Sequence, residues 1–320
     1  CAQLNKKTAI IESTHLGGIC LNWGCIPTKS LLKNADIFNL INNSSKYGIN
    51  VGEVKTDWKK IIKRSRDIAK RLSKGIEYLI KKNQIDYLVA KGKITSSSKV
   101  IATSADGNEI EYEAKDIIIA TGARAKYFPG IEPDGEKIIS YKEAMVLEKK
   151  PESLVIIGAG AIGVEFAYFY QTFGTRVTLI EALPNILPIE DEDISNELEK
   201  IFKKKNIDIR TSTQVEKIEK LSNRVKVYIK DDNVIEAEKA LIAVGVRGNI
   251  EQIGLEESGI QIEKGWIKVN SFMETSIPNV YAIGDVAGPP WLAHVASAEG
   301  ITAVEHLAGL NPEPMNYENI

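Results

Sequence analysis

The chain has 320 residues, of which 43% are hydrophobic and 26% charged, and its formal net charge is -2. This length allows two domains, and the composition is ordinary for a globular protein. The near-neutral charge gives no case for nucleic-acid or membrane binding. No signal peptide opens the sequence, no apolar run is long enough to cross a bilayer, and three cysteines are too few for a disulfide-rich secreted domain. We therefore expect a protein of the reducing cytoplasm.

The first residues are typical of the interior of a domain and not of its first strand. Cys1 is not a methionine, and residues 1–7 look like the end of a helix that enters a strand at Thr8–Ile11. Such a strand normally has another strand before the helix. We therefore expect that the first strand is missing; a mature protein after processing is the alternative. Glu12 closes the strand at 8–11, where a dinucleotide-binding fold carries an acid that accepts hydrogen bonds from the adenosine ribose.

The most informative stretch is Gly17–Lys29, GGICLNWGCIPTK, in which four residues separate Cys20 from Cys25. Pro27 suits the first turn of a helix, because its missing N–H costs nothing there. The pattern predicts a helix over 27–45 with Cys25 at or just before its N-terminus, where the helix dipole favours a thiolate. Lys29 projects from roughly the same helix face as Cys25. Two thiols and an ammonium so arranged indicate a redox site.

A zinc site, a structural disulfide and a chance pair of buried thiols each fit the two cysteines less well. A structural zinc site needs four ligands, usually in two spaced pairs, and the three cysteines and three histidines supply no second pair. A structural disulfide suits a short, Cys-rich secreted chain. Two buried free cysteines remain a minor alternative.

The first half of the chain otherwise predicts helices and short strands. Two amphipathic helices are expected over 27–45 and 57–83, the second capped by Asp57 or Thr56. A buried strand at 116–120 runs into a small turn at Thr121–Gly122, and residues 128–150 look like a connection between domains. Further strands are expected at 87–90, 93–94 and 100–103, with a hairpin turn at Asp106–Gly107.

The second half opens with a dinucleotide-binding pattern. A buried strand at Ser153–Ile157 leads into Gly158-Ala-Gly160-Ala-Ile-Gly163 and an apolar helix, and Glu181 closes the next strand, 176–180. The glycines allow the tight turn, the approach of the pyrophosphate and the packing of helix on strand. A carboxylate at 181 would bond a ribose 2′-hydroxyl and repel a 2′-phosphate, which favours NAD over NADP. A second flavin site or a decayed loop is the alternative.

The remaining elements complete this domain and return to the first. We expect a helix over 191–205, strands near 207–211, 224–230 and 240–244, and returning strands at 266–269 and 280–283.

Three segments resemble one known family. LGGICLNWGCIPTKSLL is similar to the active-site segment of the flavin disulfide oxidoreductases, and within them to the dihydrolipoamide dehydrogenase branch. TSIPNVYAIGD, residues 275–285, is similar to their second flavin fingerprint, and Leu292-Ala-His294 is closer to this branch than to glutathione or mercuric reductases. The resemblance implies an α/β fold with two interleaved Rossmann-like dinucleotide-binding domains. The FAD domain would be discontinuous, with its first part at 1–150 and a return segment at 270–320, and the NAD domain would span 151–269.

The resemblance also assigns site residues. Cys20 and Cys25 would form the redox disulfide, with Cys25 touching the flavin and Cys20 exchanging with substrate, while Lys29 lies beside the flavin and is reached by Glu165. The family usually reads Gly-Arg-x-Pro-Asn where this chain has Gly245-Val-Arg247-Gly-Asn249, which leaves the role of Arg247 open. No metal is expected. The implied FAD contacts are Glu12, Gly18, Lys29, Gly92, Thr121, Gly122, Asp285 and Ala293, and the implied NAD contacts are Gly158, Gly160, Gly163, Glu181, Val215 and Gly245.

The implied reaction is the oxidation of dihydrolipoyl groups with reduction of NAD⁺. The partners would be lipoyl domains of 2-oxoacid dehydrogenase complexes or a glycine cleavage carrier protein, and the enzyme would be a homodimer. The alternatives are another disulfide or mercuric reductase, or a non-catalytic subunit that binds lipoyl domains. Relatives continue into an interface domain that supplies a histidine base, so His294 and His306 are expected to be structural and residues 1–320 alone to be inactive.

Overall fold

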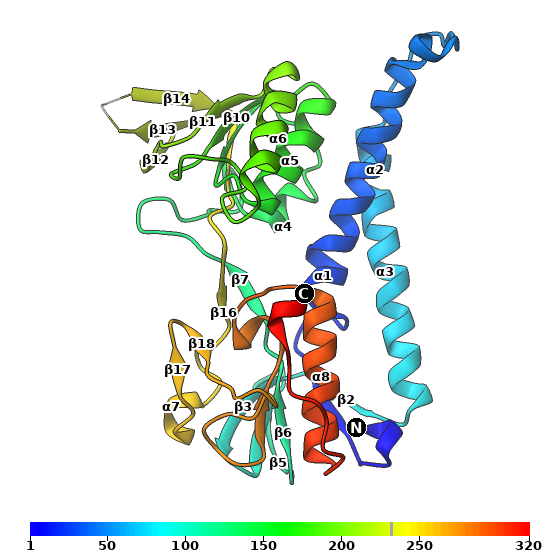
Figure 1. Cartoon of the computed structure of the whole chain (residues 1–320), viewed down its shortest axis with the longest axis vertical. Coiled ribbons are helices and arrows are strands. Elements are labelled where there is room, and N and C mark those ends of the chain that lie inside the picture. The colour runs from blue at the N-terminus through cyan, green and yellow to red at the C-terminus, as the bar shows by residue number, and fades with distance from the viewer. Residues whose placement is uncertain (231–232) are drawn as a thin grey trace. The chain divides into compact units, whose positions relative to one another are not determined.

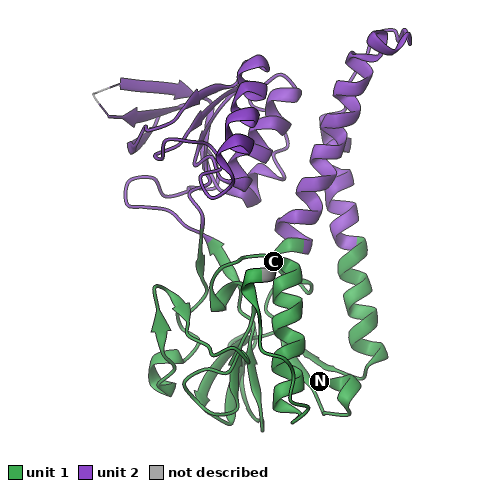
Figure 2. Cartoon of the chain, viewed as in Figure 1, with its two compact units in different colours: residues 1–20, 71–124, 246–320 green, residues 21–70, 125–245 purple. Residues whose placement is uncertain are grey.

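A computed structural model describes residues 1–230 and 233–320 and shows two compact units (Figures 1 and 2). Unit 1 comprises residues 1–20, 71–124 and 246–320, and unit 2 comprises residues 21–70 and 125–245. The units group residues that contact one another, whereas the domains expected from the sequence group residues by cofactor, and those boundaries stay predictions. Within the described residues, no helix combines the length and apolar character that a membrane span requires.

Unit 2 is built on a five-stranded parallel sheet in the order β11-β10-β9-β15-β8. The chain adds β10 and β11 on one side of β9 and then places β15 on the other, so the strand order reverses at β9. In open parallel sheets, ligands bind beyond the carboxyl ends of the strands at such a reversal. The strands are β8 (Ile138–Ile139), β9 (Ser153–Ile157), β10 (Arg176–Ile180), β11 (Asp208–Arg210) and β15 (Lys239–Ile242).

Helices and a second sheet complete the body of unit 2. Its three-stranded antiparallel sheet has the order β12-β13-β14. Isoleucine and valine side chains from both sheets, such as Val155, Ile157 and Val227, pack into one core. The parallel strands are rich in these residues because a strand that is covered on both faces is apolar along its whole length. The elements are α4 (Tyr141–Ala144), α5 (Ala161–Thr172), α6 (Glu192–Lys204), β12 (Val215–Lys220), β13 (Val225–Ile229) and β14 (Asn233–Ala237).

The sequence predictions for this body are confirmed at the strands but wrong at one connection. The strands expected at 153–157 and 176–180 are β9 and β10 to the residue, and the helix expected at 191–205 is α6. Residues 128–150 are more than a connection, because they form the edge strand β8 and the helix α4. Ser140 and Glu143 form a reciprocal capping box at the start of α4. This local signal was missed because β8 and α4 are too short to show a clear periodic pattern in the sequence.

The segment with the two cysteines leads into a pair of long helices. The elements are α1 (Gly18–Trp23), α2 (Cys25–Asn42), the 3-10 turn η2 (Ser44–Tyr47) and α3 (Trp58–Lys82). Both expected long helices are confirmed, and Asp57 caps α3 by accepting the N–H of Lys60 at 3.0 Å. The helix expected at 27–45 instead runs from Cys25 to Asn42 because the chain tightens into η2. The short helix α1 was not expected from a stretch that opens with two glycines.

Unit 1 combines short paired strands with the helix α8 (Ala293–Leu307) and residues 71–82 of α3. The pairs β1–β2 and β6–β19 are parallel, β3-β4-β5 is an antiparallel sheet, β7 pairs with β16, and β17 pairs with β18. Strands β6 and β19 contribute Ile117, Ile119, Val280 and Ala282 to one apolar core. The elements are η1 (Ala2–Leu4), β1 (Ala9–Ile11), β2 (Asp86–Leu88), β3 (Lys91–Ser96), β4 (Lys99–Thr103), β5 (Glu109–Glu113), β6 (Ile117–Ile119), β7 (Ala123–Ala125), β16 (Val246–Gly248), α7 (Leu255–Ser258), β17 (Ile262–Glu263), β18 (Trp266–Ile267), β19 (Val280–Ala282), η3 (Gly284–Ala287), α8 (Ala293–Leu307) and η4 (Tyr317–Asn319).

Candidate functional site

Cys20 and Cys25 are joined by a disulfide bond. Cys20 lies within α1 and Cys25 is the first residue of α2, with Gly24 at the N-cap. Pro27 is buried in the first turn of α2, where a proline removes no hydrogen bond that the helix could make. The predicted disulfide and the predicted position of Cys25 at a helix N-terminus are therefore confirmed.

Lys29 and Glu165 form an ion pair between Lys29 Nζ and Glu165 Oε1. Lys29 is one turn beyond Cys25 on α2, and Glu165 lies on α5, so the fold brings these two predicted residues together. The Lys29 side chain is 63% exposed and that of Glu165 is 27% exposed. An exposed ion pair contributes at most about 1 kcal/mol to stability. Its effect is therefore mainly on the local charge beside the redox helix.

Further polar contacts attach α2 to α5. The Tyr168 hydroxyl donates to Asp36 Oδ1 at 2.8 Å and accepts from Asn39 Nδ2 at 2.9 Å. Burial, with the Asp36 hydrogen bond, raises the pKa of Tyr168, so the hydroxyl keeps its proton and continues to donate. An aromatic cluster reinforces the contact, formed by Phe38, Trp58, Phe169, Tyr170 and Phe173. The helix that starts at a redox cysteine is thus held on α5 along its length.

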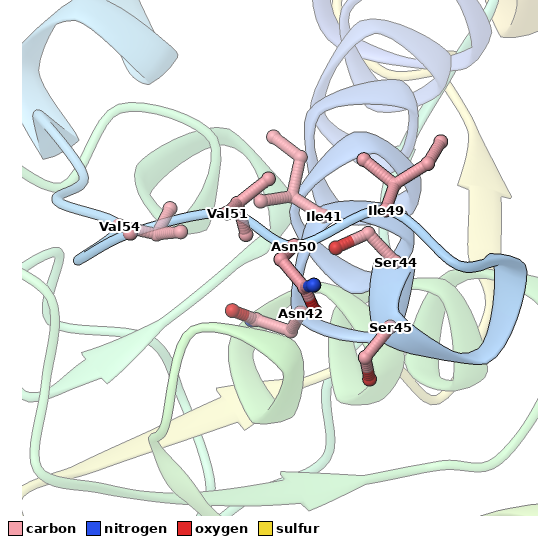
Figure 3. A pocket seen from close by; sticks show the side chains of 9 residues that line it. Ile41, Asn42, Ser44, Ser45, Ile49, Asn50, Val51 and Val54 are labelled. Carbon is pink, nitrogen blue, oxygen red and sulfur yellow. The ribbon is translucent and has the colours of Figure 1, made fainter.

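A small hollow lies at the other end of the α2–α3 pair (Figure 3). At 1.5 Å per residue, the 18 residues of α2 place its end about 25 Å from Cys25. The hollow is therefore separate from the redox centre, and we assign it no role. It is lined by Ile41, Asn42, Ser44, Ser45, Ile49, Asn50, Val51, Gly52 and Val54.

The glycine loop of unit 2 follows β9 at the point where the strand order reverses. A Cβ atom on Gly158 would lie 2.3 Å from the carbonyl oxygen of Ala243, and one on Gly163 would lie 1.9 Å from that of Gly158. Neither glycine can therefore be replaced without moving backbone. Gly160 is different, because nothing lies within 4 Å of its Cβ position. This open space before the N-terminus of α5 fits a dinucleotide pyrophosphate.

Glu181 lies beside this loop and is 9% exposed. Its Oε2 accepts the N–H of Ala159 at 2.7 Å and its Oε1 accepts that of Leu183 at 3.0 Å. A carboxylate has about four acceptor positions, so Glu181 can still accept a ribose hydroxyl. The residue both fixes the glycine loop and presents a negative charge to the site.

Two further residues predicted to contact NAD occupy the same unit. Gly245 follows β15, has a φ of 102° and has open space at its Cβ position. Val215 is the first residue of β12 and packs against the sheet core. Only Gly245 has the open backbone expected of a residue that a ligand approaches closely.

On the FAD side, the acid that follows β1 is engaged with its own turn. Glu12 Oε1 accepts the backbone N–H of Thr14 at 2.7 Å and the Thr14 hydroxyl at 2.9 Å. Gly92, in β3, lies over Ile11, since its Cβ would be 3.6 Å from the Ile11 side chain. Gly18, with a φ of 69°, starts α1. These residues shape one edge of unit 1 around the end of β1.

The Thr121–Gly122 turn is anchored to Asn249. The Thr121 hydroxyl donates to the Asn249 carbonyl at 2.8 Å, and the Asn249 N–H donates to the Gly122 carbonyl at 2.9 Å. Arg247, whose role the sequence left open, pairs with Glu251, which Arg124 also contacts at 2.7 Å. The Arg124 hydrogen bond lowers the pKa of Glu251 to about 2. Arg247 thus belongs to a charge cluster of unit 1.

Asp285 is a half-buried carboxylate in η3, and burial raises its pKa. Within the described residues, no group donates a hydrogen bond to its carboxylate. The turn that carries it is fixed by Glu299, which accepts the Gly284 N–H at 2.6 Å and the Tyr317 hydroxyl at 2.8 Å. A desolvated acceptor without a protein donor fits a ligand hydroxyl such as one from FAD, and Ala293 opens the 15-residue helix α8 in the same unit.

The sequence prediction missed Glu299, although a signal was present. Glu299 is 3% exposed inside the largely apolar helix α8, and a buried acid in such a helix needs partners. His306 accepts or donates one hydrogen bond with the Tyr281 hydroxyl at 3.0 Å and stacks on Phe272, whereas His294 is exposed. No cluster of three or more potential metal ligands occurs in residues 1–230 and 233–320.

A disulfide at a helix N-terminus, together with a glycine loop and a buried acid beside it, fits the class of flavin- and nicotinamide-dependent disulfide oxidoreductases. The sequence profile of the family described as pyridine nucleotide-disulphide oxidoreductase matches residues 1–300. The chain belongs to this family. It is an oxidoreductase. Its relatives belong to a group of enzymes that use FAD and NAD(H).

Its curated relatives are dihydrolipoyl dehydrogenases. The protein of that name from Zymomonas mobilis is 43% identical over 324 residues, which cover 100% of this chain and 70% of the relative. That from Chlorobaculum tepidum is 41% identical and matches 98% of this chain and 68% of its own length. The Acholeplasma laidlawii protein is 40% identical, and the match covers 99% of this chain and 93% of that protein.

Solved structures share the fold. LpdA (Rv3303c) from Mycobacterium tuberculosis superposes with a TM-score of 0.93 at 26% identity, over 98% of this chain and 69% of the other. RclA from Escherichia coli, described as an HOCl-induced flavoprotein disulfide reductase in its Cu(II) complex, gives 0.87 at 26% identity, over 98% and 68% of the two chains. The predicted α/β fold is therefore confirmed.

Proposed function

We propose that this protein is a dihydrolipoyl dehydrogenase that oxidises protein-bound dihydrolipoyl groups and reduces NAD⁺ to NADH. The Cys20–Cys25 disulfide carries the proposal, because it opens α2 one turn before the Lys29–Glu165 pair. The names and identities of the curated relatives support the choice of dithiol. Another disulfide reductase on the same fold is the alternative, favoured by the similarity to RclA.

The cysteines exchange electrons with the substrate by thiol–disulfide chemistry. One substrate thiolate attacks Cys20, which breaks the Cys20–Cys25 bond and releases Cys25 as a thiolate. The second substrate thiolate then displaces Cys20, so the substrate becomes a cyclic disulfide and both cysteines are left reduced. The N-terminus of α2 stabilises the departing thiolate of Cys25, which makes it the better leaving group.

The charged pair and the two dinucleotide sites have separate tasks. Lys29 places an ammonium one turn from Cys25, and Glu165 balances that charge. FAD, when bound, would supply the redox chemistry between the reduced pair and NAD⁺, which is the uptake of two electrons and their transfer with a proton as a hydride. For FAD we propose contacts with Glu12, Gly18, Lys29, Gly92, Thr121, Gly122, Asp285 and Ala293. For NAD we propose the loop of Gly158, Gly160 and Gly163 together with Glu181, Val215 and Gly245.

The partners follow from the substrate. We propose that the dihydrolipoyl group is presented by lipoyl domains of a 2-oxoacid dehydrogenase complex or by a glycine cleavage carrier protein, and that the protein works as a homodimer. A swinging lipoyl arm requires an accessible disulfide, and Cys20 and Cys25 are not among the fully buried residues.

The test is an assay with alternative substrates. The assay uses FAD-loaded protein of the full length of its relatives, because residues 1–320 alone are expected to be inactive and match 70% of the length of the Zymomonas mobilis protein. It is given dihydrolipoamide and NAD⁺, and NADH is followed by absorbance, with Cys20→Ser as the inactive control. We expect NADH from the wild type only. If dihydrolipoamide gives no NADH while NADH or NADPH reduces glutathione disulfide or Hg(II) through the same cysteines, a reductase of another specificity is the correct assignment.

A further inference from the structure

An arginine of α3 binds the short segment between the two redox cysteines through a hydrogen bond and a cation–π contact. Arg66 Nη2 donates to the carbonyl oxygen of Asn22 at 2.6 Å, and the guanidinium lies over the Trp23 ring, 4.3 Å from its centroid. Asn22 is 6% exposed and the hydrogen bond is part-buried, so water has limited access to it. Both contacted residues lie between Cys20 and Cys25. The arginine therefore acts on the four residues that set the distance between the two sulfur atoms.

The helix that carries Arg66 is itself well anchored. Ser65, beside it, is completely buried and donates to the Ile62 carbonyl at 2.8 Å. Two residues before Arg66, Arg64 Nη1 donates to the Ser30 hydroxyl of α2 at 2.7 Å. α3 thus holds the chain on both sides of Cys25, through Ser30 after it and through Asn22 and Trp23 before it.

The environment of Arg66 is expensive for a charged side chain. Burial lowers the pKa of Arg66, and its Nη1 is buried without a hydrogen-bond partner among the described residues. Leaving a buried donor unsatisfied is unfavourable, because the group loses its hydrogen bonds to water without replacement. The two contacts with Asn22 and Trp23 explain why an arginine occupies this position. A lysine has neither the planar surface to stack on Trp23 nor the forked geometry of a guanidinium.

We infer that Arg66 is a positioning residue for the redox pair, which keeps the segment from Leu21 to Gly24 folded when the Cys20–Cys25 bond is open. The inference rests on the proposed function only in taking this pair as the redox centre. Reduction breaks the Sγ–Sγ bond, takes two electrons from a dithiol and leaves two sulfur atoms joined only by the chain between them. Their effective concentration then depends on how rigidly that chain is held. Arg66 supplies the rigidity and so favours closure of the disulfide.

The test measures the dithiol–disulfide equilibrium and uses a variant that keeps the charge. The full chain with FAD is equilibrated with mixtures of reduced and oxidised dithiothreitol, its thiols are alkylated, and the peptide with residues 20–25 is quantified by mass spectrometry. We expect Arg66→Lys to shift the equilibrium towards the dithiol by roughly 3- to 10-fold, as the loss of a hydrogen bond or a cation–π contact implies. Arg71→Lys, an exposed position on the same helix, is the matched control and should leave it unchanged.

A second variant separates positioning from general destabilisation. Trp23→Leu removes the surface on which the guanidinium stacks, and its effect on the equilibrium should not add to that of Arg66→Lys. Equal equilibria in Arg66→Lys and Arg71→Lys, or additive effects of Arg66→Lys and Trp23→Leu, would overturn the inference. No lipoyl substrate or NAD⁺ takes part in the measurement, so a failure of the proposed substrate assignment would leave its result unaffected.

Discussion

Glu181 does two things with one carboxylate. It fixes the glycine loop through Ala159 and Leu183, and it gives the proposed ribose site a negative charge. Because the carboxylate is 9% exposed, water screens that charge only weakly. If the proposed NAD site is correct, this single side chain couples the shape of the loop to the choice of nicotinamide nucleotide.

Replacement of Glu181 should change that choice. In Glu181→Gln, one backbone hydrogen bond can be kept while the charge is lost, so we expect the NAD/NADP ratio of kcat/KM to fall about 10-fold or more, mainly because NADP is no longer repelled. The ratio is measured from initial rates with both nucleotides, and Glu190→Gln serves as an exposed control. An unchanged ratio would show that Glu181 is only a structural residue of the loop.

Asp285 should reveal a conflict between stability and binding. Burial raises its pKa, so the carboxylate destabilises the fold above about pH 4 and has no such effect once it is protonated. Asp285→Asn should therefore raise the melting temperature of the flavin-free protein at pH 7, lose this gain below about pH 4, and bind FAD less tightly. Calorimetry and flavin fluorescence test the two parts separately. Unaltered FAD affinity would remove Asp285 from the proposed flavin site.

At the scale of elements, α2 is the link between the disulfide and the proposed NAD-binding body. Its first residue is Cys25, and three residues of α2 pair with α5: Lys29 with Glu165, and Asp36 and Asn39 with Tyr168. Contacts at these spacings follow one face of each helix, so α2 and α5 form a single packed layer of unit 2.

The Lys29–Glu165 pair should be energetically coupled in catalysis. We expect Lys29→Met and Glu165→Gln each to slow reduction of the bound flavin, because each single change leaves one charge unbalanced. The double variant should lose less rate than the two single losses added together, since it removes both charges. Stopped-flow absorbance measures the rates. Lys63→Met and Asp67→Asn, an exposed ion pair of α3, form the control cycle. Additive effects at 29 and 165 would mean that the pair seen in the structure has no part in electron transfer.

Over the whole molecule, local patterns predicted the parts whose signals are local. β9, β10 and the disulfide segment follow from strand composition, glycine spacing and the position of Pro27. The contacts that the sequence did not predict join residues far apart in the chain, such as Arg66 with Trp23, Thr121 with Asn249 and Glu299 with Gly284. Spacing carries no information about such pairs. For Glu299, which is 3% exposed, the contact exists because a buried carboxylate needs a donor, and only the folded chain supplies one.

The central claim is that electrons enter through Cys20 and Cys25. It is tested most directly by mixing the FAD-loaded protein with one equivalent of dihydrolipoamide without NAD⁺, trapping thiols by alkylation and locating them by mass spectrometry. We predict two new alkylated residues, Cys20 and Cys25, and their return to a disulfide with formation of NADH when NAD⁺ is added before trapping. NADH formation while the Cys20–Cys25 disulfide stays intact, or a pair that dihydrolipoamide never reduces, would contradict the account.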